Sequence, residues 1–166
     1  IKKIANVLKI DNGVIKGDIV FKKDSNIPII IEVATRLSGG YFCTHEIPLN
    51  TGVDFVGNAI KIALGESINQ NELKSSAKNY VCQRYLFAKK GIVKKIPIIK
   101  KIQCMPGIEL AKLRVDVGDK IDSVSSHPGR SGVIIATGLN RIDAQNNAKN
   151  AILEINKNLI IKEELK

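Results

Sequence analysis

The chain has 166 residues, of which 44% are hydrophobic, so it can form one domain or two small lobes around a packed core, and disorder is not expected. Its formal net charge is +10, yet the excess consists mostly of lysine pairs spread along the chain, and aromatic residues make up only 4%. Nucleic-acid-binding domains more often combine clustered arginine with aromatic side chains, so this pattern argues against nucleic acid as the partner. No apolar run approaches the roughly 20 residues that cross a bilayer, so no membrane association is predicted.

The cysteines and the first residues favour a cytoplasmic protein. Cys43, Cys82 and Cys104 cannot all pair within one chain and none lies in a CxxC motif, which predicts reduced thiols. The N-terminal residues are amphipathic and lack the apolar core of a signal peptide. Because the chain begins with Ile1 rather than Met, we expect it to be a fragment of a longer protein.

The first elements are predicted to be a helix and a β-hairpin. Residues 1–10 keep a helical apolar period, and the Asp11-Asn12-Gly13 sequence that follows is typical of a helix end. Residues 14–22 and 27–33 are predicted to be antiparallel strands that flank a turn. The second strand is so continuously apolar that we expect it to be buried on both faces.

A long loop and a second helix are predicted next. Residues 36–51 contain Gly39-Gly40 and Pro48 and have no steady period, which predicts an ordered loop of the length that usually serves a function. The following helix is expected to be capped by Thr51 or Asp54 and to end near Leu64.

The polar stretch 66–78 predicts a boundary between two domains, 1–70 and 71–166. The second domain is predicted to be rich in β-structure. Its expected strands cover residues 80–89, 92–99, 109–116, 120–126 and 132–137. The third and fourth of these strands are expected to form a hairpin at Gly118-Asp119.

A terminal helix is predicted over residues 141–159, with Asn140 as its N-cap. The apolar positions of this helix are expected to face inward, namely Ile142, Ala148, Ala151, Ile152 and Ile155.

Two carboxylates of the predicted hairpin suggest a metal site. In a hairpin centred on Ser25, Asp18 lies across from Glu32, and cross-strand Cβ atoms are about 5 Å apart. Acids so close repel each other, and a divalent cation would relieve the repulsion. Magnesium suits the pair because it takes one or two carboxylates and completes its shell with water and substrate phosphates. The alternative is a hairpin with two partly solvated acids and Arg36 as their structural counter-charge.

The residues after the second strand suggest an anion site. Arg36 can reach phosphate or carboxylate oxygens with its planar guanidinium group. Ser38, Gly39 and Gly40 would let backbone N–H groups approach an anion closely. His45 is predicted either to act as a general base or substrate ligand, or to form a hydrogen bond within its loop.

Residues 29–66 resemble the core of the ATP-grasp superfamily, close to its biotin carboxylase and carbamoyl phosphate synthetase branch. The resemblance rests on Asp18, then on Glu32-Val33-Ala34-Thr35-Arg36, and then on Thr51-Gly52-Val53-Asp54. A weaker resemblance covers residues 129–152, which look like the end of the biotin carboxylase fold.

The resemblance implies an α+β fold: the antiparallel sheet and helices of an ATP-grasp C-terminal lobe, followed by a small β-rich subdomain with a terminal helix. It also implies ATP and Mg²⁺, or Mn²⁺, as cofactors, and an enzyme that joins a carboxylate to an amine or thiol through an acyl phosphate. The oligomeric state stays open, with a homodimer as one option. The parts of the family that grip the nucleotide lie N-terminal to this region, so we expect the isolated fragment to be inactive.

The family's functional residues fall on specific positions of this sequence. Asp18 and Glu32 would hold the metal, and Arg36 would stabilise the transferring phosphoryl group. Arg130 would bind a substrate carboxylate, although its glycine neighbour also suits a plain turn. The family's asparagine metal ligand falls at Ala34, a departure that leaves the metal one side-chain ligand short. A non-catalytic relative is therefore one alternative, and a basic nucleic-acid-binding domain, suggested by charge alone, is the other.

Overall fold

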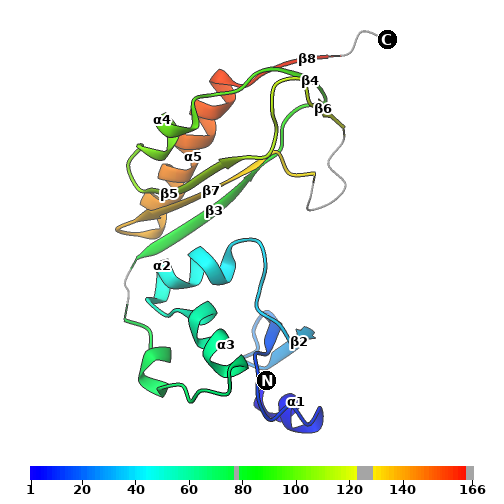
Figure 1. The fold of residues 1–166 in the computed structure, drawn as a ribbon, viewed down its shortest axis with the longest axis vertical. Helices are drawn as coiled ribbons and strands as arrows, with labels where there is room; N and C mark the ends of the chain where they lie inside the picture. The colour runs from blue at the N-terminus through cyan, green and yellow to red at the C-terminus, as the bar shows by residue number, and fades with distance from the viewer. Residues whose placement is uncertain (77–78, 123–128, 164–166) are drawn as a thin grey trace. The chain divides into compact units, whose positions relative to one another are not determined.

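The computed structural model describes residues 1–76, 79–122 and 129–163, which form two compact units, Ile1–Ala77 and Lys78–Lys166 (Figure 1). The strands are antiparallel throughout, and helices accompany the sheets in both units. This arrangement confirms the predicted α+β fold class.

The N-terminal unit contains a two-stranded sheet and short helical segments. In chain order its elements are α1 (Lys2–Val7), β1 (Lys16–Phe21), β2 (Pro28–Ala34), the π-helix η1 (Phe42–Glu46), α2 (Ile47–Thr51), α3 (Phe55–Ala63) and the 3₁₀-helix η2 (Gln70–Leu73). Asp54 caps α3 as predicted, because its Oδ1 accepts a hydrogen bond of 2.8 Å from the N–H of Gly57.

Two expectations for this unit are wrong. Residues 36–51 are not a plain loop, because η1 and α2 lie within them, and Pro48 fits the first turn of α2, where its missing N–H costs no hydrogen bond. Strand β2 is not buried on both faces, since Ile29, Ile30 and Ile31 are 45%, 40% and 65% exposed. The faces of a two-stranded sheet can be buried only where other elements pack on them. Among the described residues, no element covers the side chains of β2 fully.

The C-terminal unit contains two three-stranded sheets, ordered β3-β7-β5 and β6-β4-β8. In chain order its elements are β3 (Tyr80–Leu86), β4 (Gly91–Lys95), α4 (Ile99–Gln103), β5 (Ile108–Leu113), β6 (Lys120–Ile121), β7 (Gly132–Gly138), α5 (Arg141–Asn158) and β8 (Ile160–Lys162). Helices α4 and α5 pack on one face of the first sheet, where Figure 1 shows them side by side.

The core of this unit lies between α5 and the central strand β7. It consists of fully buried apolar side chains, namely Leu86, Ile102, Ala111, Ile134, Ala136, Ala148, Ala151 and Ile155. Small alanines on α5 let the helix approach the sheet closely. Asn140 caps α5 as predicted, but Ile142 is 67% exposed rather than inward, whereas Ala144, two residues further along the first turn, is buried.

Pairing in the C-terminal unit differs from the prediction. The turn at Gly118-Asp119 does not form a hairpin between its flanking strands, because β5 pairs with β7 whereas β6 pairs with β4. Residues 92–99 are not one strand: β4 ends at Lys95, and Pro97, which has no N–H for a sheet ladder, precedes α4. Strand β8 was not predicted. The end of the predicted strand 120–126 lies outside the described residues.

Candidate active site

The hairpin of β1 and β2 brings two carboxylates side by side. Asp18 is the register partner of Glu32, which confirms the pairing predicted from the sequence. Lys16 pairs with Ala34 two positions along, and side chains alternate along a strand, so these two residues lie on the same face as the acids. One face of the hairpin therefore presents two carboxylates, one ammonium group and one methyl group.

Lys16 forms ion pairs with both acids. Its Nζ lies 3.0 Å from Asp18 Oδ2 and 3.7 Å from Glu32 Oε1. The side chain of Lys16 is 23% exposed, whereas those of Asp18 and Glu32 are 51% and 55% exposed. The acids are thus partly solvated, as the alternative without a metal supposed, but Lys16 rather than Arg36 is their counter-charge.

A β-bulge follows the carboxylate pair directly. The register shifts between Asp18 and Ile19, so that β2 has one extra residue, Ile31, without a partner on β1. A bulge bends its strand and re-aims nearby side chains, and bulges are common beside active sites. The irregularity therefore falls next to the acids and leaves the regular ladder beyond them intact.

Arg36 lies two residues beyond the end of β2 and is exposed. Its Nη1 donates a hydrogen bond of 3.2 Å to the backbone oxygen of Leu37. In the part of the chain that the structure describes, it forms no ion pair with Asp18 or Glu32. A guanidinium group has five N–H donors in a fixed plane, so most of them remain for an anionic ligand.

The predicted anion loop forms a tight turn before η1. Gly40 and Tyr41 both have a left-handed backbone, with φ of 66° and 73°. The N–H of Phe42 donates to the backbone oxygen of Gly39 at 3.3 Å, so one N–H of this turn is used internally. Ser38 is half-buried and Gly39 is exposed. The left-handed φ explains the glycine at 40 on backbone grounds alone.

The π-helix η1 places two acid–base groups next to each other in sequence. His45 Nδ1 lies 2.8 Å from Thr44 Oγ1, and the imidazole makes an edge contact with the ring of Tyr41. The sequence analysis gave a hydrogen bond within this segment as the alternative role of His45, and this contact is such a bond. Burial raises the pKa of the neighbouring Glu46 carboxyl, whose Oε2 has no hydrogen-bond partner among the described residues.

Arg130 is held against an aromatic ring at the start of β7. Its Cζ lies 3.7 Å from the centroid of the Tyr85 ring, a cation–π contact. The next residue, Ser131, is buried, and its Oγ accepts a hydrogen bond of 3.1 Å from the N–H of Ala88. The anchored serine and the ring together fix where the guanidinium group lies. The preceding loop residues, 127 and 128, are outside the described part.

Sequence reasoning missed Lys16 and Tyr85. A lysine two positions before Asp18 on one strand shares its face, so the period of two could have identified Lys16. Tyr85 lies within the strand predicted over residues 80–89. No local pattern links it to Arg130, because the two residues are far apart in the sequence and meet only through the pairing of β3 with β7.

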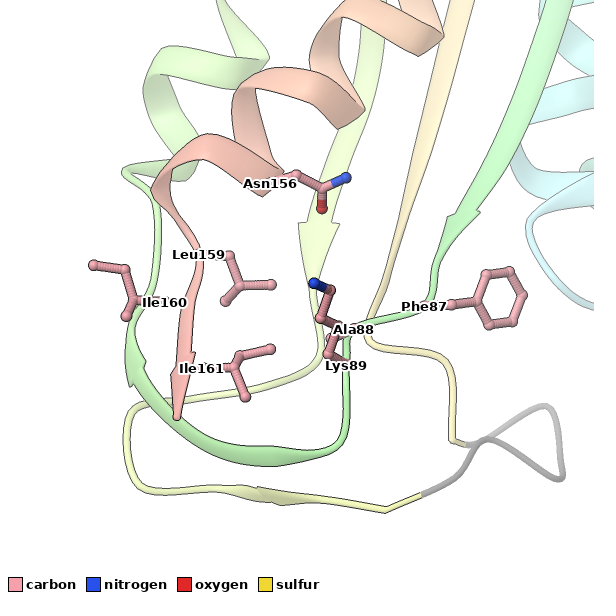
Figure 2. A pocket seen from close by; sticks show the side chains of 7 residues that line it. All are labelled: Phe87, Ala88, Lys89, Asn156, Leu159, Ile160 and Ile161. Carbon is pink, nitrogen blue, oxygen red and sulfur yellow. The ribbon is translucent and has the colours of Figure 1, made fainter. Parts of the chain in front are cut away.

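The C-terminal unit also contains a cavity of about 480 Å³ between the end of β3, the end of α5 and β8. Figure 2 shows the side chains of Ala88, Leu159 and Ile161 around the hollow, with Phe87 turned away from it. Lys89 and Asn156 are its polar lining. None of the predicted site residues lines this cavity.

Within the described residues, no group of three or more His, Cys, Asp or Glu side chains is placed to hold a metal. The pair of Asp18 and Glu32 would therefore offer a metal two carboxylate side chains. In the same described segments, no helix has the length and apolarity to cross a membrane.

Comparison with known proteins gives one family match and several structural matches. Residues 84–158 match the family model of the L-amino acid ligase C-terminal domain 2. An uncharacterised protein, y4rH of Sinorhizobium fredii, is 27% identical over 128 residues, which cover 77% of this chain and 26% of that protein.

The structural matches cover nearly the whole chain. Phosphoribosylglycinamide synthetase from Anaerococcus prevotii matches 98% of it with a TM-score of 0.69 and 19% identity. L-amino acid ligase from Bacillus licheniformis matches 97% of it with a TM-score of 0.67 and 19% identity. The chain spans only 40% and 38% of these two proteins.

These matches confirm the resemblance found in the sequence. The chain has the fold of the C-terminal portion of ATP-grasp enzymes, and within it residues 84–158 match the C-terminal domain of L-amino acid ligases.

Proposed function

We propose that this chain is the C-terminal part of an ATP-dependent ligase that joins the carboxyl group of an amino acid to an amine. The observation that carries the proposal is a pair of cross-strand carboxylates in a chain whose residues 84–158 match the L-amino acid ligase model. The broader class of carboxylate–amine or carboxylate–thiol ligases is suggested by the likeness of the fold to solved ligases. The amino acid substrate is suggested by the family match.

The residues on the hairpin face fit a magnesium ion in part. Asp18 and Glu32 offer adjacent, half-exposed carboxylate oxygens, which are the donors that Mg²⁺ prefers. Ala34 offers no donor atom, and Lys16 already pairs with both acids. When bound, the ion would neutralise phosphate charge on ATP. Two acids suffice for this role where water and phosphate oxygens complete the shell.

The proposed reaction has two steps. A carboxylate oxygen of the substrate attacks the γ-phosphorus of ATP, which gives an acyl phosphate and ADP. The amine nitrogen then attacks the acyl carbon, loses a proton, and releases phosphate. Protein catalysis of such transfers consists of positioning and of stabilising the charge that develops on the oxygens.

Each predicted site residue has a distinct role in the proposed reaction. Arg36 contacts the phosphoryl group in transit through its exposed guanidinium group. Ser38, Gly39 and Gly40 accommodate an anionic group of the substrate. Arg130, fixed by the Tyr85 ring, binds the carboxylate of the acceptor. His45 contacts the substrate or takes up the proton of the amine.

The activity belongs to the whole protein in this proposal. The chain spans about two fifths of the solved proteins that it matches, so other parts would supply the grip on the nucleotide. We propose that the 166-residue chain alone does not turn over ATP.

Trapping with hydroxylamine tests the proposal. The whole protein, given ATP, Mg²⁺, hydroxylamine and a panel of amino acids, should form an amino acid hydroxamate, because hydroxylamine intercepts an acyl phosphate. The 166-residue chain assayed alone is the negative control. Absence of an ATP-dependent hydroxamate with every amino acid in the panel, from a protein shown to bind ATP, would contradict the amino acid ligase.

A non-catalytic ATP-grasp relative is the second candidate. Two observations favour it: Ala34 stands where the resemblance leads us to expect asparagine, and a lysine ammonium group occupies the space between the acids. This candidate predicts that ATP binds to the whole protein without hydrolysis at any substrate concentration.

A further inference from the structure

The face of the hairpin that carries the acids also carries its own cation. Lys16, Asp18 and Glu32 lie on this face together with Ala34, and the Nζ of Lys16 reaches both carboxylates, at 3.0 and 3.7 Å. Opposite Lys16 stands Ala34, whose methyl group supplies no charge and no oxygen. Among the described residues, Lys16 is the cation that forms ion pairs with both acids.

A divalent cation and this ammonium group would compete for the same two carboxylates. A cation held by Asp18 and Glu32 would draw on the same two carboxylates with which Lys16 forms its ion pairs. The ammonium group must then move away, and while it remains nearby it repels the metal. Like charges held this close repel each other appreciably, because the screening near a protein surface is weaker than in bulk water.

We propose that Lys16 is a built-in competitor of the divalent cation, which weakens metal binding by Asp18 and Glu32 and keeps the two acids together when no metal is bound. The inference rests on the proposed function, because it supposes that the acids bind a metal. It goes further in assigning to Lys16, a residue outside the carboxylate pair, control over how tightly the metal is held.

Titration of the 166-residue chain with Mn²⁺, followed by the electron paramagnetic resonance of the free ion, measures this directly. Lys16→Met removes the charge and keeps the length of the side chain. It should lower the Kd for Mn²⁺ roughly tenfold at low ionic strength, and by less as added salt screens the charge. Lys16→Arg keeps a cation and should leave the Kd within about threefold of the wild-type value.

A matched control separates this effect from a change in net charge. Lys22 lies on the same hairpin just beyond β1, is exposed, and forms none of the ion pairs found among the described residues. Lys22→Met should therefore change the Kd by less than about twofold, because a charge that is fully solvated and distant from the acids is screened.

The outcomes distinguish the two proposals. Equal Kd values for wild type and Lys16→Met, with binding lost in Glu32→Gln, would overturn the role of Lys16 and leave the metal site standing. Equal tightening by Lys16→Met and Lys22→Met would also overturn it, since only net charge would matter. No Mn²⁺ binding by any variant would remove both the metal site and the competitor.

Discussion

Replacement of Arg36 and replacement of Arg130 are predicted to change different kinetic constants. Arg36 follows the strand that carries Glu32, so in the proposed mechanism it acts on the phosphoryl group in transit. Loss of such a charge typically costs roughly 10²–10³ in kcat, so Arg36→Ala and Arg36→Lys should both lower kcat in the whole protein. Lysine keeps the charge but cannot make a bidentate contact.

Arg130→Ala should instead raise the KM for the acceptor and change kcat little, because a group that binds substrate and transition state equally contributes to KM. Steady-state kinetics of the three variants, with each substrate varied in turn, decides between these roles. Small and equal effects from all three would show that both arginines are structural.

Glu46 is predicted to make stability depend on pH. Burial raises the pKa of its carboxyl in the folded chain above the ordinary value of 4.5, so the folded chain holds the proton more tightly than the unfolded chain does. Stability is therefore lost as pH rises from 4.5 through the folded pKa. Glu46→Gln cannot ionise and should escape this loss.

The Tm of Glu46→Gln relative to wild type should accordingly rise between about pH 4 and pH 7. Thermal unfolding of both proteins over this range provides the measurement. Glu66→Gln, at an exposed position of the same unit, should follow the wild type at every pH. A constant gap between Glu46→Gln and wild type would show that ionisation of Glu46 does not matter for folding.

The carboxylate pair could be predicted from the sequence by counting the hairpin register from Ser25, and Asp18 does pair with Glu32. The count succeeds only because of the bulge, since the pairs nearer the turn, such as Phe21 with Pro28, are centred between Asp24 and Ser25 and the extra residue Ile31 shifts the register by one. The contact of Arg130 with Tyr85 could not be predicted in this way, because it depends on which distant strands pair. The same register count would also have placed Lys16 on the face of the acids, but its ion pairs depend on rotamers that a sequence does not specify.

At the scale of elements, the cap of α5 is a direct test of the fold. The side chain of Asn140 accepts a hydrogen bond of 2.9 Å from the N–H of Asp143, one of the N–H groups that a helix start leaves unpaired. Asn140→Ala should cost about 1 kcal/mol of stability. Asn150→Ala, in the exposed middle of the same helix, should be neutral or slightly stabilising because alanine favours helix.

Urea unfolding of the two asparagine variants against wild type gives both free energies. A loss of equal size at both positions would indicate that side-chain contacts other than the cap matter, and would contradict the account of how α5 begins.

Individual helices and strands could be predicted better than the pairing of the strands with one another. The Asn140 cap and the strand around residues 132–137 follow from local patterns and are present as expected. The hairpin expected at Gly118-Asp119 is absent, because the chain turns there from one sheet to the other. The local turn itself exists, with the N–H of Asp116 donating to Asp119 Oδ2 at 2.8 Å. A turn does not specify which strands its flanks join.

At the scale of the whole molecule, burial was the least predictable property. The apolar run 27–33 indicates a strand, and β2 confirms it, but the run cannot show how much of the chain covers that strand. The fold class was predictable because the motifs of the hairpin and the following helix lie close together in sequence. The substrate was not, because no residue pattern in the loop before α2 specifies one.

The central claim is that Asp18 and Glu32 hold the metal of an ATP-dependent ligase. Magnesium-dependent phosphate release by the whole protein, with its best amino acid substrate, tests it most directly. Glu32→Gln and Asp18→Asn keep the shape of the side chains and lose their charge, so both should abolish release at limiting Mg²⁺, whereas Glu66→Gln should retain wild-type activity. Near-wild-type release from both hairpin variants at limiting Mg²⁺ would contradict the assignment.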